Sequence, residues 1–219
     1  MTFTKKPIKQ GLYNPKNEHD SCGVGFVANI HGKKSHQIVL QGLEILTNLT
    51  HRGATGYDPK LGDGAGILLQ VPDDFFRAET KKISINLPDE GHYGIGMLFL
   101  PQDAKIRKEC EKIISQIINE EDQHELGWRD VPVNNKDIAK AAKHVEPFTR
   151  QVFIGRANNL DTQNAFERKL FVIRKRIENA ISKLDFSDPA NFYVNSMSSR
   201  TIVYKAKLVI IIKTYYKNL

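Results

Sequence analysis

The chain has 219 residues, of which 40% are hydrophobic and 26% charged, so it is long enough to bury a substantial core in one domain. Its two cysteines, Cys22 and Cys110, are too few for a disulfide framework, and no signal peptide pattern opens the sequence, which predicts a reducing, cytoplasmic setting. The net charge of +7 is spread among acidic residues, which argues against nucleic acid as a partner, and no apolar run is long enough to predict a membrane span.

The first 21 residues are polar and show neither helical nor strand periodicity. Alternating apolar residues from Val24 to Ile30 then predict a strand, closed by a turn at 31–32. Apolar residues at helical spacing predict a helix that follows an N-cap at Ser35 and ends at about Thr50. A strand, turn and helix are therefore expected to open the folded part of the chain.

Cys22 lies on the boundary between the polar leader and the predicted strand, with glycines at 23 and 25. The glycines leave space in which another backbone or a ligand can approach the sulfur. Free cysteines are, however, often buried and behave as small apolar residues. From the residues alone, a reactive thiol and a packed thiol both remain open.

A glycine-rich sequence at 62–66, Gly-Asp-Gly-Ala-Gly, is the next unusual feature. It can be interpreted as a phosphate cradle. It lacks the Rossmann spacing and the Lys-Ser or Lys-Thr of a P-loop, and an apolar strand ending at Pro72 follows it instead of a helix. A glycine turn that leads into a strand is the favoured interpretation, with phosphate binding as the alternative.

The remaining elements mix helices and strands without regular alternation. In order, we expect a short helix at 73–77, a buried strand at 92–100, a helix at about 106–121, an edge strand at 125–133, a linker or short helix at 138–144, a strand at 150–155, a long helix from about 162 to 184, and strands at 191–195 and 201–205. Cys110 lies on the apolar face of its helix, which predicts core packing. The pattern favours an α+β fold with antiparallel strands.

Five sequence blocks together resemble the start of the glutamate synthase large subunit: Tyr13-Asn14-Pro15, residues 18–25, His51-Arg52-Gly53-Ala54, residues 62–66 and residues 198–205. In that family this region is a class II glutamine amidotransferase domain. The resemblance implies the N-terminal nucleophile hydrolase fold, with two antiparallel sheets between helical layers (αββα), here incomplete at its C-terminal end. It implies an enzyme part that hydrolyses glutamine to glutamate and releases ammonia for 2-oxoglutarate at a separate synthase site.

The resemblance also implies a division of the chain and roles for particular residues. Residues 1–21 would be a propeptide, 22–205 a partial amidotransferase domain, and 206–219 a divergent tail. Removal of the propeptide would make Cys22 the N-terminal nucleophile, with its own α-amino group as the base. Arg52 and Gly53 correspond to the Arg-Gly pair that supports the nucleophile in this family.

The chain departs from the family pattern in one respect that bears on activity. No Asn-Gly dipeptide, the family's oxyanion donor pair, occurs in the sequence, and the residues that clamp glutamine cannot be assigned. The alternative reading is therefore a truncated, non-catalytic remnant of the same domain. The implied partners are glutamine, the other domains of the large subunit and a small reductase subunit. FMN and an iron-sulfur cluster belong to regions of the full-length enzyme outside this chain, and no cofactor or metal site is expected within it.

Overall fold

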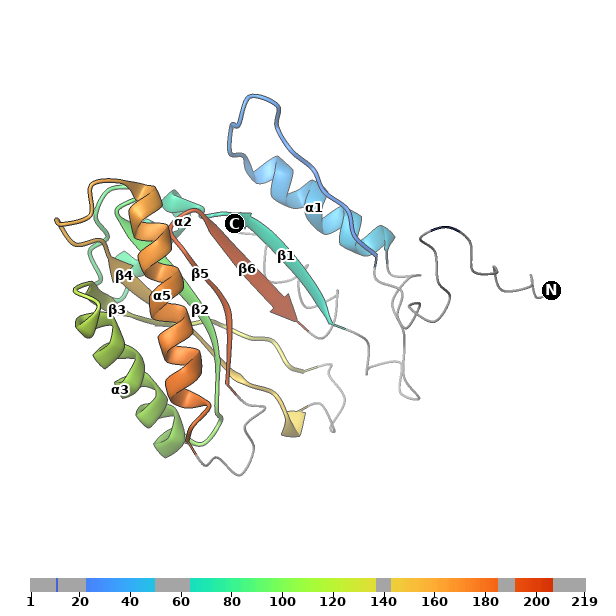
Figure 1. The fold of residues 1–219 in the computed structure, drawn as a ribbon. Coiled ribbons are helices and arrows are strands. Elements are labelled where there is room, and N and C mark those ends of the chain that lie inside the picture. The colour runs from blue at the N-terminus through green and yellow to red at the C-terminus, as the bar shows by residue number, and fades with distance from the viewer. Residues whose placement is uncertain (1–10, 12–22, 50–63, 137–142, 185–191, 207–219) are drawn as a thin grey trace.

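The computed structural model describes residues 11, 23–49, 64–136, 143–184 and 192–206 (Figure 1). The elements within these ranges are α1 (His36–Asn48), β1 (Ala65–Gln70), α2 (Asp73–Lys81), β2 (Tyr93–Leu100), α3 (Ala104–Glu120), β3 (His124–Asp130), β4 (Phe148–Gly155), α5 (Gln163–Ile181), β5 (Tyr193–Ser198) and β6 (Thr201–Ala206). Among the described residues, no helix is long and apolar enough to cross a membrane.

Two antiparallel sheets organise the described chain. One has four strands in the order β3-β4-β2-β5, and the other pairs β1 with β6. Figure 1 shows α3 and α5 side by side on one face of the four-stranded sheet, with the β1–β6 pair on the opposite side and α1 beyond it. The prediction of a mixed fold with antiparallel strands is confirmed.

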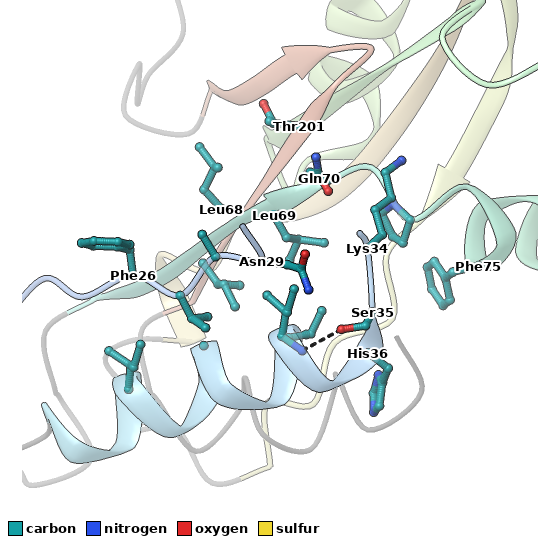
Figure 2. Close-up of a pocket in the computed structure, with 18 of the residues that line it drawn as sticks. Phe26, Asn29, Lys34, Ser35, His36, Leu68, Leu69, Gln70, Phe75 and Thr201 are labelled. Atoms are coloured by element: carbon teal, nitrogen blue, oxygen red, sulfur yellow. Dashed lines mark hydrogen bonds between the residues drawn. The ribbon is translucent and has the colours of Figure 1, made fainter. Parts of the chain in front are cut away.

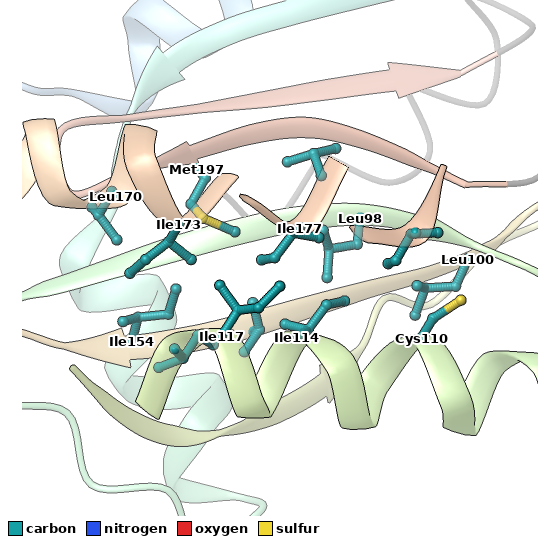
Figure 3. Packing of buried hydrophobic residues seen from close by; sticks show 14 of the residues in the cluster. Leu98, Leu100, Cys110, Ile114, Ile117, Ile154, Leu170, Ile173, Ile177 and Met197 are labelled. Carbon is teal, nitrogen blue, oxygen red and sulfur yellow. The ribbon is translucent and has the colours of Figure 1, made fainter. Parts of the chain in front are cut away.

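The first of two hydrophobic clusters lies between the four-stranded sheet and the helices α3 and α5 (Figure 3). Each helix places one face into this cluster, and the buried residues recur at helical spacing, as the sequence predicts. The fully buried members are Leu98, Leu100, Cys110, Ile114, Ile118, Val152, Ile154, Phe166, Leu170, Ile173, Ile177 and Val194. Cys110 is 0% exposed, which confirms its predicted packing role, and burial raises the pKa of its thiol to about 11.

The second cluster lies on the other face of the four-stranded sheet. Tyr93, Ile95 and Met97 of β2 point into it, while Leu98 and Leu100 belong to the first cluster. Its other buried members include Leu43 of α1, Phe76 of α2, Phe153 of β4, and Ile202 and Tyr204 of β6. Strand β2 is therefore buried on both faces, which explains why its sequence is a continuous apolar run.

Local sequence signals account for where the helices begin. The Ser35 side chain accepts a hydrogen bond from the Ile38 amide at 3.4 Å, so the predicted N-cap of α1 is confirmed. Thr162 caps α5 in the same way, accepting from the Ala165 amide at 3.1 Å. Asp103 caps α3. Its carboxylate accepts hydrogen bonds from the backbone amides of Ile106 and Lys105, and these bonds hold the pKa of the carboxyl below its usual value.

The predicted strand at 24–30 is wrong. None of residues 23–34 is in a strand, and Val24, Phe26 and Ile30 are 87%, 91% and 92% exposed. Alternation indicates a strand only where a neighbouring strand supplies hydrogen bonds, and no such ladder to residues 23–30 occurs among the described residues. The turn that follows does form, with the Gly32 amide donating to the Asn29 carbonyl at 2.9 Å.

The other boundaries differ from the predictions by a few residues. The helix expected at 73–77 extends to Lys81, and the strand expected at 191–195 is Tyr193–Ser198. The edge strand expected at 125–133 is β3, which does lie at the edge of its sheet but ends at Asp130. Most of 138–144 lies outside the described residues.

A buried polar chain connects the two sheets. The Arg129 guanidinium on β3 pairs with Glu79 at 2.7 Å and donates to the Gln151 side-chain oxygen at 3.1 Å. The Gln151 amide on β4 in turn donates to the Tyr204 hydroxyl on β6 at 3.3 Å. Burial raises the pKa of Tyr204 to about 12.

We expect Ile173→Ala to lower the free energy of unfolding by about 2–5 kcal/mol, because it leaves a cavity between α5 and the sheet. The matched control is Val172→Ala at the next position of the helix, where the side chain is 42% exposed and the expected loss is below about 0.5 kcal/mol. Urea unfolding followed by circular dichroism measures both. Equal losses for the two variants would contradict the described packing.

We expect Tyr204 to make stability fall as the pH rises from about 10 to about 12, because the unfolded chain loses the phenol proton over this range while the folded chain keeps it. Tyr204→Phe has no proton to lose, so its free energy of unfolding should decline less over the same interval. Urea titrations at several pH values measure this slope.

The control for this measurement is Tyr193→Phe. A hydrogen bond from Lys205 lowers the pKa of Tyr193, so removing that phenol should not make the decline smaller. If the Tyr204→Phe curve runs parallel to that of the unsubstituted protein, the proposed contribution of Tyr204 is wrong.

Candidate functional site

A groove of about 1250 Å³ lies between two walls of the structure. One wall consists of residues 23–36 and α1, and the other of β1 and the start of α2 (Figure 2). Figure 2 shows Phe26 and Asn29 on the first wall and Leu68 and Gln70 on the second. The first wall begins directly after Cys22, so this groove is the described cavity nearest in sequence to the predicted nucleophile.

Two glycines bring the backbone after Cys22 against α1. A Cβ atom at residue 25 would lie 2.5 Å from Cγ2 of Ile45, and one at residue 23 would lie 3.1 Å from Cδ2 of Leu49. A side chain at residue 25 would therefore collide with α1, and one at residue 23 would require the Leu49 side chain to shift by a few tenths of an ångström. The sequence indicated that the glycines leave space for a close approach, and the structure fills that space with side chains of α1.

Lys34 closes one part of the groove. Its ammonium forms an ion pair with Glu90 and donates to the Val71 carbonyl at 3.2 Å. These contacts tie the turn before α1 to the segment that follows β1 and to the segment before β2. The first wall is thus connected to the second through a lysine that local sequence patterns did not single out.

Asp73, at the start of α2, is held by two neighbours. The Tyr93 hydroxyl donates to one carboxylate oxygen at 2.7 Å, and Arg77 donates to the other at 2.7 Å. Burial and the hydrogen bond to Asp73 raise the pKa of Tyr93. The hydrogen bond between Arg77 and Asp73 likewise raises the pKa of Arg77. Arg77 also donates to the carbonyls of Leu87 and Pro88. Because both oxygens of Asp73 are engaged, we assign this residue a structural role at the edge of the groove.

The groove carries charges of both signs. Its lining includes the basic residues Lys33, Lys34 and Lys82 and the acidic residues Asp74, Glu79 and Glu90. Hydrogen bonds donated by Lys82 and Arg129 lower the pKa of the Glu79 carboxyl. None of the described lining residues is a cysteine. Among the described residues there is also no group of three or more His, Cys, Asp or Glu side chains suited to a metal ion. The described part supplies a mixed polar and apolar surface, and a nucleophile would come from a neighbouring residue.

The predicted site residues Cys22, Arg52 and Gly53 lie outside the described residues. Their chain neighbours are described: Gly23 follows Cys22, and Leu49, the C-cap of α1, precedes Arg52 by three positions. Gly23 and Leu49 themselves lie close together, since a Cβ at residue 23 would lie 3.1 Å from Cδ2 of Leu49.

The glycine-rich sequence at 62–66 is described from Gly64 onward. The predicted strand after it is confirmed as β1, and a Cβ at Gly66 would lie 3.1 Å from the Tyr204 carbonyl oxygen. The close approach that Gly66 permits is therefore to the neighbouring strand β6. This observation supports the interpretation as a turn leading into a strand.

Sequence reasoning missed Ile45 as a contact of the glycine segment and missed the partners of Asp73. Ile45 could be placed on a helix, but nothing local indicates which backbone packs against it. Asp73 and Arg77 were open to detection, since opposite charges four residues apart on a helix form pairs. Their link to Tyr93, twenty residues away, depends on the tertiary fold.

We expect Asp73→Asn to lower the free energy of unfolding by about 1–3 kcal/mol, because the charge that Arg77 and Tyr93 share is lost. Asp74→Asn is the matched control, since that side chain is exposed at the adjacent position and should change stability by less than about 0.5 kcal/mol. Chemical denaturation at neutral pH compares the two. An Asp73→Asn variant as stable as the control would contradict the assigned role.

Comparison with known proteins places the chain among enzymes that use glutamine. The model of the family described as glutamine amidotransferases class-II matches residues 22–219. The match therefore begins at Cys22.

Several curated glutamate synthases are similar to the chain. It is 50% identical over 208 residues to the glutamate synthase [NADPH] large chain of Bacillus subtilis (strain 168), covering 95% of this chain and 13% of that protein. It is 42% identical over 203 residues to ferredoxin-dependent glutamate synthase 2, chloroplastic, of Arabidopsis thaliana, covering 93% of this chain and 12% of that protein. It is 37% identical over 211 residues to glutamate synthase [NADH] of Saccharomyces cerevisiae, covering 92% of this chain and 10% of that protein. The chain thus spans a small part of the length of these relatives.

Proposed function

We propose that this chain, which belongs to the class II glutamine amidotransferase family, hydrolyses glutamine to glutamate and releases ammonia for a glutamate synthase reaction. The observation that carries the proposal is the family match over residues 22–219, which starts at the predicted nucleophile. The similarity to glutamate synthases that are named for three different electron donors supports the same activity. The alternative of a non-catalytic remnant is not favoured by these matches.

The proposed chemistry begins when residues 1–21 are removed and Cys22 becomes the N-terminal residue. A free α-amino group has a pKa of about 7.7–8.0, close to that of an ordinary thiol, so it can accept the thiol proton. The sulfur attacks the side-chain amide carbon of glutamine, and the tetrahedral intermediate expels ammonia after the leaving nitrogen is protonated. Water then hydrolyses the thioester to glutamate and restores the thiol.

A role for Arg52 and Gly53 beside Cys22 is part of the proposal, and its support is the closeness of their described chain neighbours. Gly23 packs against Leu49, which precedes Arg52 by three positions in the sequence. Cys22 is bonded to Gly23. The two predicted segments therefore start from adjoining points, and Arg52 can support the cysteine end as the resemblance implies.

The N-terminal nucleophile hydrolase fold is part of this proposal. Its support is the order of layers: helices α3 and α5, the four-stranded sheet, the β1–β6 pair, and α1 beyond it (Figure 1). In the proposed arrangement Cys22 lies near β1 and α1, at the end of the groove where the chain enters the described region.

The synthase step is proposed to take place elsewhere. Because the chain spans 13% or less of the three relatives described above, the acceptor site for 2-oxoglutarate, the FMN and the iron-sulfur cluster are assigned to other domains of the large subunit. A small reductase subunit and a cytoplasmic setting complete the proposed context. Within this chain the proposed ligand is glutamine alone.

The proposal predicts that Cys22→Ala abolishes release of ammonia from glutamine, with a loss of about a thousandfold or more, because no other group replaces the covalent nucleophile. Cys110→Ala is the matched control, since it removes the buried thiol and should leave the activity in place. A coupled assay for glutamate measures both variants in the 219-residue chain, and intact mass determines whether residues 1–21 have been removed.

Retention of residues 1–21 in the active protein would overturn the N-terminal nucleophile. Equal activity of Cys22→Ala and the unsubstituted chain would overturn the assignment of Cys22. A chain without measurable glutaminase activity that gains it when the next hundred or so residues of its natural sequence are appended would support a truncated domain.

A further inference from the structure

We propose that Glu167 of α5 is a positioning residue for the groove. Its carboxylate holds the β5–β6 corner, which we define as residues 198–201, and the corner in turn holds the point at which the two groove walls are joined. This inference rests on the proposed function, because that function gives the groove its purpose. It assigns a role to a helix residue that neither the sequence blocks nor the family match singled out.

At the β5–β6 corner the chain passes from one sheet to the other. Strand β5 pairs with β2 in the four-stranded sheet, and β6 pairs with β1 in the two-stranded sheet. Only Ser199 and Arg200 separate the two strands. The conformation of these two residues therefore determines how the β1–β6 pair is placed against the larger sheet.

Glu167 accepts three hydrogen bonds from this corner. One carboxylate oxygen accepts from the amide and from the hydroxyl of Ser199, both at 2.6 Å, and the other accepts from the Ser198 hydroxyl at 2.9 Å. Ser198 and Ser199 are 9% and 4% exposed, so water has little access to compete for these groups. A carboxylate accepts hydrogen bonds and cannot donate them, so both hydroxyl protons point to Glu167.

The orientation of the Ser198 hydroxyl leaves its lone pairs available to the backbone of the corner. This oxygen accepts from the Arg200 amide at 3.0 Å and from the Thr201 amide at 3.2 Å. With one proton and two lone pairs, the hydroxyl is then fully used. A hydrogen-bond donor in place of the Glu167 oxygen would compete with the two amides for the same lone pairs. Only an acceptor at residue 167 completes the arrangement.

Val71, which directly follows β1, connects the corner to the groove. Its amide donates to the Arg200 carbonyl at 2.9 Å, and its carbonyl accepts from the Lys34 ammonium at 3.2 Å. Lys34 belongs to the first wall, and Val71 continues the second wall. A series of hydrogen bonds therefore runs from Glu167 through the corner to both walls.

The test is the position of the Thr201 and Val71 amide signals, measured by NMR on the isotope-labelled 219-residue chain. Glu167→Gln keeps the size of the side chain but replaces one acceptor with a donor. It should shift both signals at least about threefold further than Arg168→Gln, the matched control at the next, exposed position of α5. These signals come from folded molecules, so a loss of stability alone does not move them.

Ser198→Ala tests the same link from the corner and does not depend on whether Glu167→Gln folds. It removes the acceptor of the Thr201 amide and should also shift the Val71 signal. Ser196→Ala is its matched control on β5, because that hydroxyl is equally buried but accepts from the Val203 amide at 3.0 Å, outside the corner. It should leave the Val71 signal in place.

The double variant Glu167→Gln/Ser198→Ala separates positioning through Ser198 from two unrelated effects. Its shift at Val71 should be smaller than the sum of the two single shifts, because both changes break the same link. A shift equal to that sum would overturn the inference. So would a Val71 signal that neither Glu167→Gln nor Ser198→Ala moves beyond its control.

The spectra are recorded without glutamine, so this result stands apart from the Cys22→Ala assay. A chain without glutaminase activity would overturn the proposed function and leave the shifts interpretable. Unmoved signals would overturn the role of Glu167 and leave the proposed function intact.

Discussion

Strand β2 is buried on both faces, and each face contributes to one of the two hydrophobic clusters. Gly94 gives α5 room on one face, because a Cβ there would lie 2.6 Å from Leu170, and Gly96 gives room to Val152 of the neighbouring strand β4, 2.7 Å from a Cβ at that position. The helical layer can therefore approach the strand closely, while Ile95 and its neighbours face the β1–β6 pair. A strand packed in this way holds the sheet, α5 and the two-stranded sheet in one stack.

The candidate site lies at the far side of this stack, away from α3 and α5. Its walls are connected to the core through α1, β1 and the polar chain that runs from Arg129 through Gln151 to Tyr204. Arg129 is 8% exposed, and its positive charge is paired with the carboxylate of Glu79. The buried charge in this hydrogen-bonded series is therefore not left unpaired. The core thus provides a rigid support, and the groove is built on elements attached to it.

The sequence could predict elements whose signal is local. The helical repeat of Ile173 and Ile177 and the apolar face that contains Cys110 depend only on the period of the backbone, and these assignments are confirmed. The strand predicted at 24–30 failed because alternation says nothing about whether a partner strand is present. The long-range contacts of Gln151 could not be foreseen, since its partners come from other strands.

The candidate site was predicted from a combination of short blocks in the right order. That combination identified Cys22, Arg52 and Gly53, and the family match confirms the class of protein but does not test these residues. The contact of Gly25 with Ile45 could not be predicted from the sequence, because a glycine indicates that another group approaches its backbone closely but does not identify that group. The site residues therefore stay a prediction from short sequence blocks, while the tertiary fold shows what approaches the glycines at 23 and 25.

The pairing of β1 with β6 has a consequence for synthesis of the protein. Gln70 pairs with Thr201, so 131 residues (201 minus 70) must follow β1 before its partner emerges from the ribosome. At translation rates of about 5–20 residues per second, the delay is on the order of 10 seconds. During that time β1 is an apolar strand without its partner, exposed to chaperones and to other nascent chains. The wall of the groove is therefore among the last parts of the domain to be completed.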